Sequence, residues 1–191
     1  MDDRLLWYTT RGSGAVALIL LSAVVVLGLC ARMRVESAAW PRFLSAALHR
    51  DLSLTACVFL VLHVVTAVVD PFTHLGIVAA TVPFGSGYRT LWLGLGTISL
   101  ELGAAVLATS LLRRHIGPRV WRLVHWLAYA AWPTALLHSV GTGTDTREAW
   151  MIAVVAVSTA AVGAALVWRL AAAGRTAGAG IARIRSLGDR A

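Results

Sequence analysis

Residues 48–65, LHRDLSLTACVFLVLHVV, form the stretch that decides the fold. They place His49 and His63 fourteen residues apart within one apolar segment. An α-helix rises about 1.5 Å per residue, with about 3.6 residues per turn, so the two imidazoles would lie about 20 Å apart on nearly the same face. A titratable side chain inside a membrane segment is a candidate functional residue, because burying it in lipid is costly.

A second stretch repeats this arrangement. Residues 121–145, WRLVHWLAYAAWPTALLHSVGTGTD, hold His125 and His138 thirteen residues apart. Thirteen residues make about 3.6 turns, which leaves the second imidazole roughly 0.4 turn away from the face of the first. Pro133 lies between them and removes a backbone hydrogen bond to the carbonyl of Tyr129, so a kink or rewinding at this proline is one way to turn His138 back.

The composition is that of an integral membrane protein. Of the 191 residues, 58% are hydrophobic and 14% are charged, and the mean hydropathy of +0.75 is far from that of soluble domains. A helix of about 20 apolar residues crosses the hydrocarbon core. We predict an all-α bundle of five transmembrane helices, at residues 12–31, 52–69 with a start near His49, 90–112, 123–144 and 149–168.

The segments outside these spans complete the predicted organisation. Residues 71–88 contain two prolines and several glycines, so we expect a surface or re-entrant loop there. Residues 1–170 are predicted to form the helical bundle. Residues 171–191 are predicted to form a basic, flexible tail on the cytoplasmic side.

The basic residues set the predicted orientation. All 17 are arginine, and most gather in the first connection, the third connection and the tail, which the positive-inside rule assigns to the cytoplasm. The N-terminus is therefore predicted outside and the C-terminus in the cytoplasm. The net charge of +8 does not indicate nucleic-acid binding, because the arginines lie between spans. The absence of lysine suggests a GC-rich genome, so we expect the cytoplasmic membrane of a bacterium.

The two histidine-bearing helices run in the same direction, so their histidines form two levels. His49 and His125 lie toward the cytoplasm, and His63 and His138 lie toward the outside. Imidazole is a common axial ligand of haem iron, and two imidazoles fill both axial positions, which favours electron transfer over binding of a reactive ligand. The pattern predicts two haems stacked across the membrane, with one iron between each pair.

Two other functions fit the same histidines. A transport protein would use them to bind a transition metal or to relay protons, although His49 and His63 are too far apart to share one ion. A haem-free structural subunit would use them only for hydrogen bonds between helices. A reduced-minus-oxidised spectrum distinguishes these alternatives from the haem protein.

The two quoted stretches resemble the ferric reductase-like transmembrane domain. That superfamily includes NADPH oxidases, ferric reductases and the haem-binding membrane subunit of methionine sulfoxide reductase systems, and the likeness extends over roughly residues 10 to 170. The resemblance implies that the four histidines are axial ligands of two b-type haems. It also implies that electrons pass from the cytoplasmic haem to the outer one, as in an oxidoreductase component.

This sequence departs from the family pattern in two ways. Aligning the histidine helices leaves it without the first helix of the oxidases. After Trp168 there is a short tail with no G-x-G-x-x-G unit, so we expect no flavin or nicotinamide domain. The chain would then depend on a separate electron donor, either a flavin reductase or membrane quinol, and on an external acceptor.

Two functions are possible for each of four further charged residues. Glu101 lies within the third predicted span, where a carboxylate is costly. It would relay protons or contact a quinone, or it would only hydrogen-bond to a neighbouring helix. Arg50 and Arg122 at the inner face, and Arg89 at the outer face, would neutralise haem propionates, or they would only set the topology.

The remaining histidines and the cysteines are assigned no function. His74 and His115 fall in predicted connections without a partner at matching spacing, so we expect them to be solvated or interfacial. Cys30 and Cys57 lie in apolar segments, where a free cysteine behaves as a small hydrophobic residue. We expect no structural disulfide between them.

Overall fold

The computed structural model describes residues 3–33, 41–71 and 75–188, and of residues 3, 42 and 176–188 it describes the backbone alone. His74 lies outside the described residues. The described chain is helical and has no strand, which confirms the predicted all-α class. Its helices are α1 (Asp3–Arg32), α2 (Arg42–Val69), α3 (Gly76–Thr81), α4 (Thr90–Leu111), α5 (Arg113–His125), α6 (Ala128–Thr142) and α7 (Ala149–Gly188).

Several of these helices are long and apolar enough to cross a membrane. Within the described residues there are four such spans, Arg4–Arg32, Phe43–Val69, Thr90–Leu111 and Ala149–Arg175, so the chain is a multi-pass membrane protein. The predicted span at 123–144 is divided between α5 and α6. The 15 residues of α6 reach only about 22 Å, less than the hydrocarbon thickness of about 30 Å. The fifth crossing therefore stays a prediction, as does the orientation of the termini.

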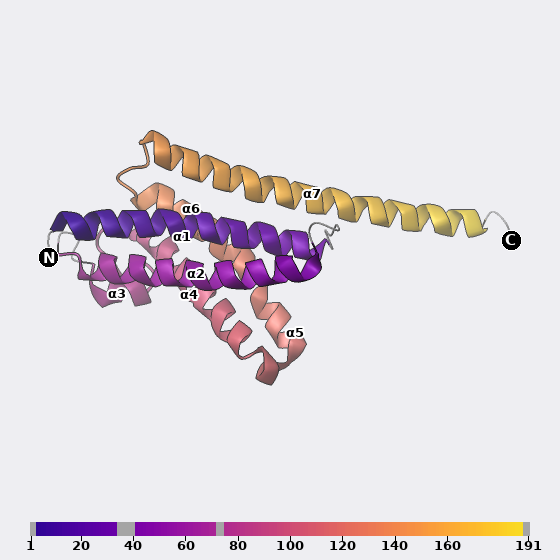
Figure 1. Cartoon of the computed structure of the whole chain (residues 1–191), viewed down its shortest axis with the longest axis horizontal. Helices are drawn as coiled ribbons and strands as arrows, with labels where there is room; N and C mark the ends of the chain where they lie inside the picture. The colour runs from indigo at the N-terminus through magenta and orange to yellow at the C-terminus, as the bar shows by residue number, and fades with distance from the viewer. Residues whose placement is uncertain (1–2, 34–40, 72–74, 189–191) are drawn as a thin grey trace.

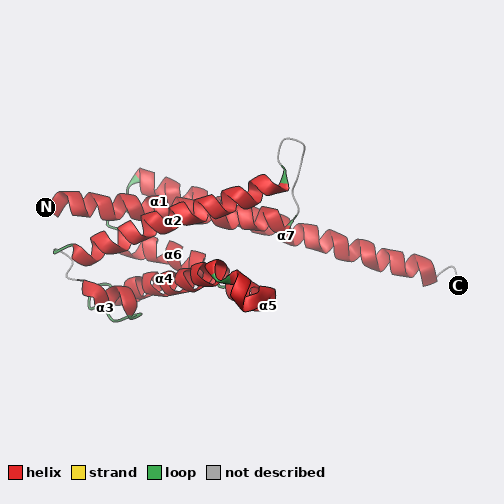
Figure 2. Ribbon diagram, turned by 60° about the horizontal axis from the view of Figure 1, so that its bottom comes forward, coloured by secondary structure: helices red, strands yellow, loops and turns green. Residues whose placement is uncertain are grey.

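The helices pack as two antiparallel pairs joined through α1. Helix α1 packs along α2, and α4 packs along α6, while α1 also contacts α6 and α7. Figure 1 shows α1 between α2 and α7, and Figure 2 shows α3, α4 and α5 on one side of α2. Close packing between α2 and α6 is absent in the described residues, so the two histidine-bearing segments face each other across a gap in the helix packing.

Small residues on α1 allow this close packing. Ser13, Ala15 and Ala17 of α1 are buried, as expected where helix backbones approach closely in a membrane. A hydrogen bond also ties α6 to α1, because the indole of Trp132 donates to the hydroxyl of the buried Ser22 at 2.9 Å. Helix α1 is thus the central element that holds both halves of the bundle.

The fourth predicted span changes its helical winding just after His125. The amide of Leu127 donates to the carbonyl of Val124 at 2.9 Å, and the amide of Tyr129 donates to that of Trp126 at 3.1 Å. These bonds span three residues, as in a 3₁₀-helix, which turns further per residue than an α-helix. Helix α6 continues through Pro133, so the change of winding lies N-terminal to this proline rather than at it.

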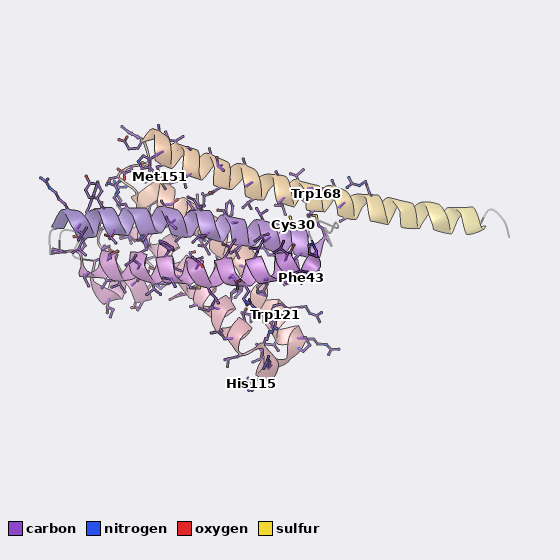
Figure 3. The ribbon with its side chains drawn as sticks, in the orientation of Figure 1. Cys30, Phe43, His115, Trp121, Met151 and Trp168 are labelled. Atoms are coloured by element: carbon purple, nitrogen blue, oxygen red, sulfur yellow. The ribbon has the colours of Figure 1, made fainter. Side chains whose placement is uncertain are left out.

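The two ends of the bundle carry different elements. Figure 3 places Met151 near one end, and Cys30, Phe43 and Trp168 toward the other. Helix α3 lies within the predicted loop 71–88, and the hydroxyl of Thr97 on α4 fixes it by donating to the carbonyl of Ala79 at 2.7 Å. Helix α7 passes residue 170 without ending and extends beyond the bundle (Figure 1).

Candidate functional site

The structure brings the four histidines together as two pairs. The ring centroids of His49 and His125 lie 6.2 Å apart, and the two planes meet at 59°. The ring centroids of His63 and His138 also lie 6.2 Å apart, and their planes meet at 79°. These are the pairs that the sequence places at the same level, and each joins α2 to the segment formed by α5 and α6.

The separation within each pair suits two ligands of one metal. An imidazole nitrogen binds a metal at about 2.0 Å and the ring centre lies about 1.1 Å behind it, so two rings on opposite sides of a metal have centres about 6.2 Å apart. Each pair has that separation. In the described part of the chain, no three His, Cys, Asp or Glu side chains form a metal-binding group. That the two imidazoles of a pair bind one metal ion stays a prediction.

Three of the imidazoles are oriented by a backbone carbonyl of a neighbouring helix. The Nδ1 atom of His49 lies 3.0 Å from the oxygen of Val24, and that of His63 lies 2.7 Å from the oxygen of Thr10. The Nδ1 atom of His138 lies 2.9 Å from the oxygen of Trp92. Because a carbonyl oxygen only accepts, Nδ1 carries the proton in each bond, and Nε2 of the neutral imidazole keeps its lone pair.

His125 is held in a different way. Its Nδ1 atom is buried and has no hydrogen-bond partner among the described residues. Its ring stacks on that of Trp121, with centroids 5.0 Å apart and planes at 30°, and the indole of Trp121 donates to the hydroxyl of Ser110 at 3.3 Å. An aromatic contact on one face thus takes the place of the carbonyl that orients each of the other three rings.

A mainly apolar cleft opens beside His63 and His138. Its empty volume, with the open space at its mouth included, is about 660 Å³. Helices α1, α2, α3, α4 and α6 all contribute to its lining, which includes Leu60, Leu93 and Ala135. Both imidazoles of the outer pair, His63 on α2 and His138 on α6, also line this cleft.

The charged candidates are exposed or make contacts with other groups. Glu101 is exposed on α4 and does not line the cleft. The guanidinium of Arg89 donates to the carbonyl of Gly141 at 2.6 Å, and that of Arg50 pairs with Asp51 at 2.9 Å at an exposed position. Arg122 is exposed on α5. Contacts of these arginines with propionates, and a redox role of Glu101, remain predictions.

Two other expectations concern residues without an assigned function. His115 is exposed on α5, in agreement with a solvated or interfacial position. Cys30 and Cys57 are free thiols on α1 and α2. Neither cysteine nor His115 lines the cleft at the outer pair.

Sequence reasoning missed the groups that orient the histidines. Backbone carbonyls carry no side-chain signal, but Gly14 and Gly28 are spaced by fourteen residues, like His49 and His63. It also missed the ion pair between Arg11 and Asp145, whose closest atoms lie 2.5 Å apart. The two residues are far apart along the chain, so no local sequence pattern predicts their contact.

Comparison with known proteins gives one match. Residues 13–136 match the family model described as ferric reductase like transmembrane component. The matched segment includes His49, His63 and His125 and ends two residues before His138. No curated protein and no solved structure matches this chain.

Proposed function

Because this chain belongs to the ferric reductase like transmembrane family, we propose that it carries electrons across a membrane through two b-type haems. His49 and His125 would be the axial ligands of the inner haem iron, and His63 and His138 those of the outer one. The observation that supports this most strongly is the equal 6.2 Å separation of the two pairs. Bound haem would supply a one-electron couple at each level.

The residues around the pairs suit this role. A porphyrin fills four positions around its iron and leaves two axial ones, which is the number that each pair provides. The apolar lining beside His63 and His138 would surround the outer haem mainly with hydrocarbon groups. Hydrogen bonds from Nδ1 to carbonyls make the imidazoles more basic ligands, which favours the oxidised iron.

The proposed direction of transfer is from the cytoplasm to the outside. The positive-inside rule assigns the exposed arginines Arg113, Arg114 and Arg119 on α5 to the inner side. Moving an electron out of a negative interior is favourable, by a free energy of about 2.3 kcal/mol per 100 mV of membrane potential. The donor would be a flavin reductase or quinol, and the acceptor a ferric chelate, oxygen or an external oxidoreductase. We propose the cytoplasmic membrane of a bacterium as the location.

The two alternative functions fit the structure to different extents. A bare transition metal is usually held by three or four protein ligands, and the described residues provide no such group. A haem-free structural subunit would also use its histidines for hydrogen bonds to carbonyls. It would not require two pairs with centroids 6.2 Å apart.

The test is a spectrum of the purified protein. The protein would be produced in haem-replete cells, and its reduced-minus-oxidised spectrum and haem content would be measured. We expect b-type absorbance and two haems per chain. If the haem-replete preparation shows no b-type absorbance, the proposal is wrong. Bound copper or zinc would then favour a metal-binding protein, and no cofactor would favour a structural subunit.

A further inference from the structure

Each imidazole that bonds to a carbonyl also lies against a glycine of the same neighbouring helix. In all three cases the glycine follows the carbonyl residue by four positions, which places both on one side of the helix. We call each carbonyl with its glycine a seat. The seats are Thr10 with Gly14 for His63, Val24 with Gly28 for His49, and Trp92 with Gly96 for His138.

The two seats on α1 repeat one arrangement at two levels. Gly14 and Gly28 are fourteen residues apart, and so are His49 and His63 on the antiparallel helix α2. Fourteen residues make about 3.9 turns, so both seats lie on nearly the same side of α1. A regular antiparallel packing of α1 on α2 therefore orients both histidines of α2 at once.

The seats differ in how tightly they enclose the ring. A methyl group added to Gly14 would lie 2.8 Å from Nδ1 and 2.9 Å from Cε1 of His63. One added to Gly96 would lie 2.7 Å from Cε1 and 2.9 Å from Cγ of His138. These distances are well below the optimum of about 3.5–4.0 Å for carbon contacts. One added to Gly28 would lie 3.4 Å from Cε1 of His49, an ordinary contact.

We propose that Gly14 and Gly96 are positioning residues for the outer haem. Because they lack a side chain, His63 and His138 approach the backbone of α1 and α4 closely enough for Nδ1 to bond to a carbonyl. Each ring is thereby fixed with Nε2 as its remaining ligand atom. This inference rests on the proposed function, since it assigns the two seats to the two ligands of one haem.

The histidines of the inner pair are held less tightly by seats than those of the outer pair. Gly28 leaves His49 more space, and His125 has no seat, since its Nδ1 is without a partner among the described residues. The outer haem therefore has both ligands fixed by tight seats, and the inner haem has one ligand in a looser seat. A substitution that disturbs a tight seat should act on the outer haem alone.

The experiment compares Gly14→Ala and Gly96→Ala with matched glycine variants. Gly12→Ala on α1 and Gly103→Ala on α4 are the controls, because a methyl group at either position meets nothing within 4 Å. Haem content, redox titration and the low-spin EPR spectrum of the oxidised protein are measured for each. We expect Gly14→Ala and Gly96→Ala either to halve the haem content or to shift the midpoint and EPR signal of one haem. The affected haem should be the outer one, which His63→Ala is expected to lack.

A purely structural role of these glycines predicts another result. If Gly14→Ala and Gly96→Ala keep both haem signals unchanged, or if they disturb both haems equally, the inference is wrong. The control variants should keep two haems with unchanged midpoints. Gly28→Ala should leave the outer haem unchanged, and any shift should be confined to the inner one.

A double variant keeps the inference testable if Gly14→Ala does not fold. His63→Ala lacks the ring that the added methyl group would meet. The double variant with His63→Ala and Gly14→Ala should therefore have the same yield of folded protein and the same melting temperature as His63→Ala alone. A further loss in the double variant would overturn the inference, because it would show that Gly14 serves helix packing. This comparison needs no haem, so it stands apart from the test of the proposed function.

Discussion

The Nδ1 atom of His63 donates a hydrogen bond to the carbonyl oxygen of Thr10, 2.7 Å away across the interface between α1 and α2. Helix α1 carries no candidate ligand, yet its backbone orients both histidines of α2, through Thr10 and Val24. The arrangement of these histidines thus depends on a helix whose own sequence indicates only a membrane span.

The pairing of the histidines is testable by single substitutions. His63→Ala and His138→Ala should each remove the outer haem and leave the inner one, so haem content falls from about two to about one per chain. His49→Ala and His125→Ala should each remove the inner haem. Redox titration identifies which haem remains. Loss of the same haem from His63→Ala and His125→Ala would contradict the pairing.

The contact between Trp121 and His125 gives a prediction for the inner haem. Trp121→Leu removes the ring on which His125 stacks, so the inner haem should show a shifted midpoint and a broader EPR signal. Trp121→Phe keeps an aromatic ring and loses only the hydrogen bond to Ser110, so its effect should be smaller. Equal effects of the two variants, or any shift of the outer haem, would argue against this role of the stacked ring.

Gly141 gives a prediction for the packing of α6 on α4. A methyl group at Gly141 would collide with the indole ring of Trp92, whose carbonyl holds His138. Gly141→Ala should therefore destabilise the protein by about 1–3 kcal/mol, as overpacking does, and disturb the outer haem. Thermal melting and haem content in detergent measure the two effects, with Gly103→Ala as the control. A Gly141→Ala protein with unchanged melting and outer haem would show that Trp92 can move without consequence.

The ion pair between Arg11 and Asp145 gives a prediction for stability. Both side chains are mostly buried, with 15% and 23% of their surfaces exposed, and the guanidinium also lies 3.9 Å from the ring centroid of Trp7. Asp145→Asn leaves Arg11 without its counter-charge and should cost on the order of 2 kcal/mol. The comparison is with Asp51→Asn, whose pair with Arg50 is exposed. Equal melting temperatures of the two variants would count against the importance of the buried pair.

The helices with strong apolar patterns could be predicted from the sequence. The residues of α4 and the start of α7 agree with expectation to within a residue, because charges and breakers lie directly at these ends. The prediction also places His49 with His125 and His63 with His138, because helical rise and direction alone determine the level of a residue along a span. Their role as haem ligands stays a prediction.

The local winding after His125 could not be predicted. Pro133 is the visible helix breaker, but the three-residue hydrogen bonds occur at Leu127 and Tyr129, where no glycine or proline stands. The tertiary positions of α5 and α6 outweigh the weak local preferences there. The seats were missed for a similar reason, since the register between α1 and α2 decides which carbonyl and which glycine face an imidazole.

Electron transfer through vesicles tests the central claim most directly. The haem-loaded protein is reconstituted into lipid vesicles that contain ferricyanide, and dithionite is added outside as a reductant that crosses the bilayer poorly. Wild-type vesicles should reduce the enclosed ferricyanide faster than protein-free vesicles, and His49→Ala and His63→Ala should both lose this rate, because both haems lie on the path. A wild-type rate equal to that of protein-free vesicles would contradict the account.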